Sequence, residues 1–150
     1  MKICLGGTFD RLHKGHKKLL ETAAEKAGGN GYIFVGVTKG EIVEHKQKIQ
    51  SFEKRKNNVE KFLKKIDKKF SFDIKPIKDK YGPAIKGDFD AIVVSPETRK
   101  VAEEINEKRK SLDLKKLEII EIPWVLAEDD KPIRSTRIRK NEINPDGELN

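Results

Sequence analysis

Short apolar segments alternate with amphipathic helical segments along most of the chain, and this alternation limits the possible folds more than any other feature. Five runs have the length and the β-branched or alternating character of buried strands. They are residues 3–5, 32–38, 70–77, 91–94 and 117–122. Because strands that alternate with helices pair in parallel, the pattern predicts a single-domain, Rossmann-like α/β fold, with a five-stranded parallel sheet and helices on both faces.

Three longer helices are predicted between these strands from apolar residues that recur on one helical face. The first begins near Gly15, and the second follows Ser51, a favourable N-cap residue. The third is opened by Pro96 in its first turn and carries its apolar face as far as Leu112. We expect residues 1–140 to form one domain and residues 141–150 to form a polar, poorly ordered tail.

Composition limits the class of protein and its expected location, but it does not identify a function. The 150 residues can bury a core without disulfides, and the one cysteine, Cys4, has no partner for an internal disulfide. No secretion signal and no apolar run of about 20 residues is present, so we expect a cytoplasmic protein with no membrane partner. The net charge of +8 suits nucleic acid, anionic lipid or phosphorylated metabolites.

The segment 6–16, GGTFDRLHKGH, lies between the first strand and the first helix, where open α/β sheets bind ligands. Gly6 and Gly7 allow a tight turn, and Gly15 leaves free N–H groups at the start of the helix to face a phosphate. His13 and His16 offer imidazole donors beside them. Three histidines and one cysteine are too few for a typical zinc site, so we predict no metal ligation, although an incidental surface pair stays possible.

A second group of candidate phosphate-binding side chains occurs at residues 133–139, IRSTRIR, after the fifth strand. Ser135 or Thr136 can cap a short helix. Hydroxyls, backbone N–H groups and several arginines provide charge-assisted donors suited to the β- and γ-phosphates of a triphosphate. The alternative is a basic surface turn.

Together these residues resemble a known family. Thr8-Phe9-Asp10 with His13-Lys14-Gly15-His16 resembles the T-F-D and H-x-G-H signature of the nucleotidyltransferase superfamily, and residues 133–139 resemble its I-S-S-T-x-x-R motif. Arg134 replaces the first serine of that motif, and Arg11 stands where many bacterial members have proline. In this respect the chain is similar to archaeal-type phosphopantetheine adenylyltransferases.

The resemblance implies transfer of an adenylyl group from ATP, with Mg²⁺, to 4′-phosphopantetheine, giving dephospho-coenzyme A and pyrophosphate. The implied ATP-binding residues are Gly7, Thr8, Phe9, His13, Gly15, His16, Arg99, Ser135, Thr136 and Arg139. The implied acceptor-binding residues are Thr8, Lys46 and Lys48. The implied catalytic residues are His16, Lys48 and Arg139.

Three alternatives stay open. A related nucleotidyltransferase that uses CTP with glycerol phosphate, or ATP with FMN or nicotinamide mononucleotide, would share both motifs. A nucleic-acid-binding module is supported only by the charge of +8, so we expect no specific nucleic-acid partner. A fragment of a class I aminoacyl-tRNA synthetase would need a tRNA-binding region that 150 residues scarcely permit. The oligomeric state is left open.

Overall fold

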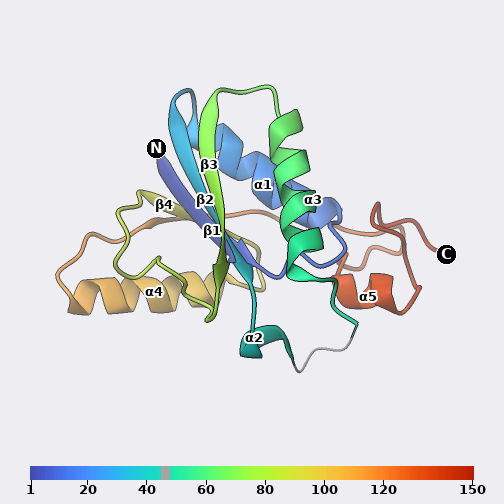
Figure 1. Cartoon of the computed structure of the whole chain (residues 1–150). Coiled ribbons are helices and arrows are strands. Elements are labelled where there is room, and N and C mark those ends of the chain that lie inside the picture. The colour runs from blue at the N-terminus through green and yellow to red at the C-terminus, as the bar shows by residue number, and fades with distance from the viewer. Residues whose placement is uncertain (45–47) are drawn as a thin grey trace.

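A computed structural model describes residues 1–44 and 48–150, and it has the alternating α/β order expected from the sequence (Figure 1). The strands are β1 (Lys2–Gly7), β2 (Gly31–Thr38), β3 (Phe70–Ile77), β4 (Ala91–Val94) and β5 (Glu118–Glu121). The helices are α1 (Lys14–Ala27), α2 (Glu41–Glu44), α3 (Phe52–Lys65), α4 (Arg99–Ser111) and α5 (Ser135–Arg139). Each predicted strand is present, and the short helix α2 was not expected. Within the described residues, no helix is long and apolar enough to cross a membrane.

The sheet is parallel throughout and has the strand order β3-β2-β1-β4-β5, which confirms the predicted fold class. The chain builds outward from β1 through β2 to β3, and then returns to place β4 on the other side of β1. The strand order therefore reverses between β1 and β4. In open α/β sheets, ligands bind beyond the carboxyl ends of the strands at this point.

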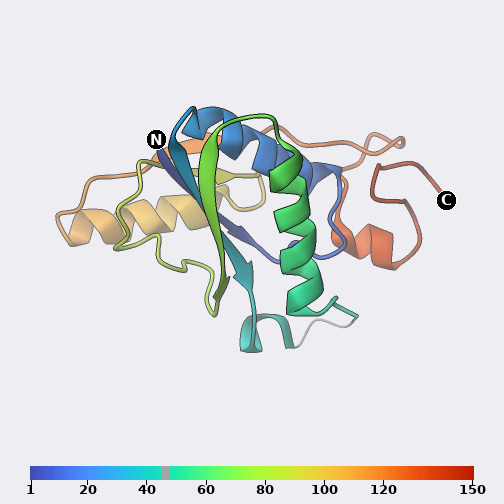
Figure 2. The ribbon, with the colours of Figure 1, turned by 45° about the horizontal axis from the view of Figure 1, so that its top comes forward.

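Helices cover both faces of the sheet (Figures 1 and 2). In β1, alternate side chains point to opposite faces, so that Ile3 and Leu5 join the core beneath α1 and α3, whereas Cys4 joins the core beneath α4. Burial raises the pKa of the Cys4 thiol to about 12, which keeps it protonated. The cysteine is therefore a packing residue.

The start and the end of α4 differ from the prediction. Ser95 to Thr98 form a turn closed by a 3.1 Å hydrogen bond from the Ser95 N–H to Thr98 Oγ1, and the helix begins only at Arg99. Pro96 therefore lies in this turn and not in the helix. At the other end Leu112 is 48% exposed and follows the last helical residue, so its predicted place on the apolar face is wrong.

The last ten residues pack against the domain, so the expectation of a poorly ordered tail is also wrong. Ile143 is buried in a small core with Ala127 and Ile133. The Lys14 N–H, at the start of α1, donates a 3.0 Å hydrogen bond to the Pro145 carbonyl. One buried isoleucine and a few backbone hydrogen bonds are enough to hold a segment that is otherwise polar, and the segment supports the start of α1.

Candidate active site

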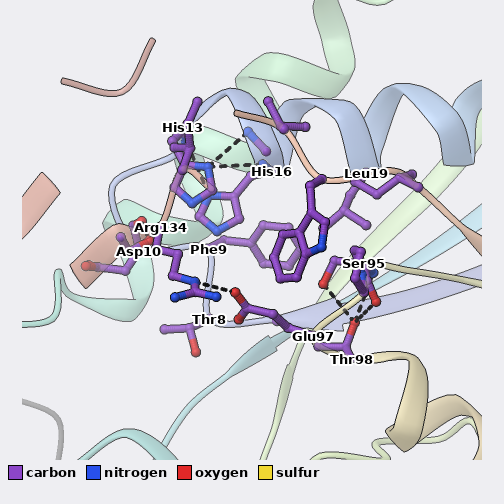
Figure 3. Close-up of a pocket in the computed structure, with 18 of the residues that line it drawn as sticks. Thr8, Phe9, Asp10, His13, His16, Leu19, Ser95, Glu97, Thr98 and Arg134 are labelled. Carbon is purple, nitrogen blue, oxygen red and sulfur yellow. Dashed lines mark hydrogen bonds and ion pairs between the residues drawn. The ribbon is translucent and has the colours of Figure 1, made fainter. Parts of the chain in front are cut away.

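A pocket of about 550 Å³ opens at the carboxyl ends of β1 and β4, at the predicted point of strand-order reversal (Figure 3). It is lined by the end of β1 and the following loop, the start of α1, the turn after β4, and the segment from β5 to α5. The two sequence motifs, more than 100 residues apart, thus share one cavity. The predicted site residues that line it are Gly7, Thr8, Phe9, His13, Gly15, His16, Ser135, Thr136 and Arg139.

The two motif histidines cap the start of α1. His13 is the N-cap residue, and its Nδ1 accepts hydrogen bonds from the Gly15 N–H at 3.0 Å and the His16 N–H at 3.3 Å. His16 Nδ1 in turn accepts from the His13 N–H at 3.2 Å, and the two rings stack with centroids 3.6 Å apart. This is a reciprocal capping box made by two imidazoles.

The backbone N–H groups at the start of α1 are therefore not free for a ligand, contrary to the expectation from the sequence. The Gly15 and His16 N–H groups donate to His13 Nδ1, and the Lys14 N–H donates to the Pro145 carbonyl. Gly15 has a different role from the one expected. A Cβ at this position would lie 2.9 Å from the His13 ring, so glycine makes room for the imidazole.

Both histidines are neutral. Burial lowers the pKa of His13 to about 4, although the nearby Asp10 carboxylate opposes the shift. Burial and the neighbouring His13 hold the pKa of His16 well below its usual value. Because each Nδ1 accepts a hydrogen bond, each ring carries its proton on Nε2. The site thus offers imidazole N–H donors at fixed positions in place of the backbone donors that we expected.

Asp10 connects the two motifs. Its carboxylate accepts from the Gln50 N–H at 2.8 Å and from Nη1 of both Arg11 and Arg139 at 2.7 Å. Burial alone raises the pKa of Asp10, but these three hydrogen bonds hold it below its usual value, so the carboxylate stays ionised. Its backbone carbonyl accepts from the Ser135 hydroxyl at 2.6 Å. The sequence contained the signal, in the T-F-D motif, but we did not include Asp10 among the site residues.

A buried arginine fixes the loop after β1. Arg55 is 2% exposed, and its guanidinium donates to the carbonyls of Thr8 at 3.0 Å, Thr38 at 2.7 Å and Gln50 at 2.9 Å. Desolvation lowers the pKa of Arg55, while Asp10 opposes the shift. The Thr38 hydroxyl also donates to Thr8 Oγ1 at 3.1 Å. Arg55 therefore positions Thr8, a role that we did not predict from the sequence.

The tight turn before α1 is made by residues other than the two glycines. Phe9 and Arg11 have φ values of +53° and +48°, in the left-handed region that disfavours side chains, whereas Gly6 and Gly7 end β1 in extended conformation. A Cβ on Gly7 would lie 3.3 Å from the Phe9 ring. The glycines thus provide space for neighbouring side chains, and strain is held at two residues of the motif.

The second motif gives its hydroxyls to internal contacts. Ser135 is the first residue of α5 and Arg134 is its N-cap, without a side-chain capping bond, so the predicted capping by Ser135 or Thr136 is wrong. Thr136 Oγ1 accepts from Arg139 Nη2 at 3.1 Å. Together with Asp10, this contact holds Arg139 at the pocket wall.

Two predicted site residues, Arg99 and Lys48, lie outside the lining of the pocket. Arg99 is outside the lining of the pocket, and its guanidinium donates to Glu103 at 3.0 Å and Glu121 at 3.2 Å. Lys48 is exposed, with a φ of +62°, and its carbonyl accepts from Arg11 at 2.7 Å. Lys46 lies outside the described residues. Across the parts of the chain that are described, no group of three or more His, Cys, Asp or Glu side chains is arranged to hold a metal.

Comparison with known proteins identifies the family of the chain. The cytidylyltransferase-like family model matches residues 4–141. Phosphopantetheine adenylyltransferase from Methanosarcina mazei is 40% identical over 149 residues, which are 99% of this chain and 96% of that protein. The enzyme of the same name from Archaeoglobus fulgidus is 42% identical over 147 residues, covering 96% of each chain.

Solved structures extend the comparison to the fold. A protein with unknown function from Archaeoglobus fulgidus has a TM-score of 0.70 and 35% identity, covering 81% of this chain and 89% of that one. A pantoate-beta-alanine ligase from Francisella tularensis is 14% identical and has a TM-score of 0.60, and the match covers 92% of this chain and 65% of the ligase chain. It therefore shares the fold. The chain therefore belongs to the cytidylyltransferase-like family, where it groups with the archaeal phosphopantetheine adenylyltransferases.

Proposed function

We propose that the protein transfers an adenylyl group from ATP to 4′-phosphopantetheine and releases pyrophosphate and dephospho-coenzyme A. The observation that carries this proposal is the identity of about 40% to archaeal phosphopantetheine adenylyltransferases over nearly the whole chain. The pocket supports it, because both phosphate-binding motifs line the same cavity. A cavity of about 550 Å³ is also within the usual size for a small-molecule site. A cytoplasmic location would suit this reaction.

In the proposed reaction, a phosphate oxygen of the acceptor attacks the α-phosphorus of ATP, and the bond from that phosphorus to the bridging oxygen of pyrophosphate breaks. The acceptor phosphate is already ionised at neutral pH, so no side-chain base is required. Catalysis then depends on positioning and on donors aimed at the developing charge. The pocket has such donors in the His16 Nε2–H and the Arg139 guanidinium.

The internal contacts of the site explain why these donors would act without reorganising. The His16 ring is fixed by its bond with the His13 N–H and by ring stacking, and Arg139 is fixed by Asp10 and Thr136. We propose that Mg²⁺ enters with ATP, because phosphate oxygens are the hard ligands that it prefers. It would offset charge on the triphosphate and on the departing pyrophosphate.

The acceptor phosphate is assigned to Thr8, with Lys48 and Lys46 as the cations that hold it. Thr8 lines the pocket and is fixed through Arg55. Arg99 is assigned a contact with ATP, for which its guanidinium would have to leave Glu103 and Glu121.

A panel of acceptors tests the proposed function. Pyrophosphate release should be measured with ATP or CTP and each of 4′-phosphopantetheine, glycerol phosphate, FMN and nicotinamide mononucleotide, with Mg²⁺ and with chelator. We expect turnover with ATP and 4′-phosphopantetheine that stops on chelation. Negligible turnover with this pair beside rapid turnover with another would reassign the substrate and keep the family. Release of pyrophosphate unaffected by chelation would remove Mg²⁺ from the proposal.

A further inference from the structure

The mouth of the pocket contains an ion pair that the proposed reaction does not use. Glu97, in the turn after β4, accepts a 2.6 Å hydrogen bond from Nε of Arg134, the residue before α5. Figure 3 shows the two side chains meeting across the pocket, and both line it. The Arg134 guanidinium also lies 5.6 Å from the centroid of the Trp124 ring.

We propose that Glu97 takes the place of a nucleotide phosphate before ATP binds. It holds Arg134 across the pocket and releases it to the polyphosphate group when ATP binds. This inference rests on the proposed function, because it takes the ligand to be a nucleoside triphosphate and the product to be pyrophosphate. It makes Glu97 a residue that sets the strength of polyphosphate binding.

The first argument is the contrast between the two carboxylates that line the pocket, Asp10 and Glu97. Asp10 is 1% exposed and accepts from three donors that fix it in place. Glu97 is 48% exposed, and within the described residues its carboxylate accepts one hydrogen bond, from Arg134. A carboxylate at the mouth of an anion site weakens binding by like-charge repulsion unless a cation offsets it.

The second argument is that Arg134 can move to a ligand without a change in the backbone. The next residue, Ser135, is fixed to the Asp10 carbonyl, and Arg139 lies on the same pocket wall. The base of the Arg134 side chain therefore stays close to these two residues. The Arg134 side chain is 51% exposed, and its guanidinium is carried on a long flexible chain. Arginine forms bidentate bonds with phosphate as readily as with carboxylate, so the two anions compete for one cation.

Competition between Glu97 and a polyphosphate for Arg134 weakens binding of the polyphosphate and favours release of the product. Each polyphosphate that takes Arg134 breaks the ion pair and leaves Glu97 unpaired beside bound negative charge. The same amount of binding free energy is lost for ATP and for pyrophosphate, provided that both use Arg134. Glu97 thus favours departure of the product, which leaves when the carboxylate takes the guanidinium back.

A double-mutant cycle on ligand affinity tests this inference. The dissociation constants of pyrophosphate and of ATP are measured by calorimetry with Mg²⁺, without acceptor, for wild type, Glu97→Gln, Arg134→Ser and the double variant. We expect Glu97→Gln to tighten pyrophosphate binding about fivefold in the wild-type background. In the Arg134→Ser background the gain should be about two- to fivefold smaller, because no ion pair is then lost.

Asp88→Asn is the matched control for net charge. Asp88 forms an exposed ion pair of 2.8 Å with Lys2, next to the start of β1 and so at the other end of the strand from the pocket. The control should change pyrophosphate affinity less than 1.5-fold, since exposed charges beyond a Debye length are screened.

The outcomes separate the two proposals. Equal gains from Glu97→Gln in the two backgrounds would show that Arg134 never leaves Glu97, and would overturn the inference while leaving the proposed function intact. Wild-type protein that binds neither ATP nor pyrophosphate would overturn both. Tightening by Asp88→Asn as large as that by Glu97→Gln would also overturn the inference, because net charge alone would then account for it.

Discussion

The two sides of the pocket differ in how their polar groups are held. Beside the start of α1, His13 and His16 accept hydrogen bonds from each other's backbone N–H groups, Asp10 is held by Arg11, Arg139 and a backbone N–H, and Asp10 and His13 are buried. At the mouth, Glu97 and Arg134 are half exposed and share one ion pair. The first side is set before a ligand arrives, which favours transition-state stabilisation. The second side can adjust to the ligand that enters.

The largest expected effect is on stability. Asp10→Ala removes a buried carboxylate that accepts from Arg11, Arg139 and the Gln50 N–H, so each of these donors loses this acceptor. We expect a loss of about 3 kcal/mol or more in the free energy of unfolding, measured by urea denaturation. Glu97→Ala is the control from the other side and should change stability by about 0.5 kcal/mol or less. Similar losses in the free energy of unfolding for Asp10→Ala and Glu97→Ala would contradict the difference between the two sides of the pocket.

The pH dependence of the free energy of unfolding should come from the side of the pocket beside the start of α1, where His13 is buried. His13 has a pKa of about 4 when folded, below the value of about 6.5 for a free imidazole, so the unfolded chain binds more protons between these values. The contribution of neutral His13 to the free energy of unfolding is therefore fully present above about pH 6.5. It is lost as the pH drops toward 4, by on the order of 3 kcal/mol. Urea denaturation at several pH values measures it. His13→Asn keeps a capping side chain and should flatten the slope, whereas an unchanged slope would exclude His13 as its source.

Activity should depend on His16 more than on any residue of the mouth. His16→Ala removes a fixed N–H donor, and we expect kcat to fall by roughly 100-fold or more, measured by pyrophosphate release. Loss of the capping box should also cost about 1 kcal/mol of stability, a cost that was not visible in the sequence. Arg134→Ser should leave kcat within about threefold of wild type. A folded His16→Ala variant with near-normal kcat would remove His16 from the mechanism.

The smallest expected effects are changes in KM for ATP that distinguish Arg139 from Arg99. Arg139→Lys keeps the charge but loses the planar pair of donors, so we expect a rise of about tenfold in KM for ATP, and a larger defect for Arg139→Ala. Arg99→Ala should change KM for ATP by about twofold or less, because the proposed contact of Arg99 with ATP would first have to break its ion pairs with Glu103 and Glu121. An effect of Arg99→Ala as large as that of Arg139→Lys would show that the contact with ATP far outweighs the loss of these ion pairs.

The sequence predicted the sheet and the pocket wall well, for a physical reason. A buried parallel strand needs a run such as YIFVGVT, and a phosphate site needs donors in loops at strand ends; both are local patterns. The contacts that fix the site are not local. Gln50 and Arg139 reach Asp10 from 40 and 129 residues away, and no spacing rule reveals them. Capping by His13 was missed for another reason: imidazole is not among the usual N-cap side chains.

The distance along the chain between Asp10 and its partners has a consequence for biosynthesis. Arg139 and Ser135 follow Asp10 by 129 and 125 residues, so they are translated long after it, as is Pro145, which supports the start of α1. Contacts of such sequence separation form slowly, and a nascent chain folds from its amino end. On the ribosome, β1 and the histidine helix can therefore emerge and pair with β2 while the catalytic cavity is still incomplete. The cavity is completed only after residues 135–145 have left the ribosome, so a nascent chain that lacks them has no complete site with which to bind nucleotide.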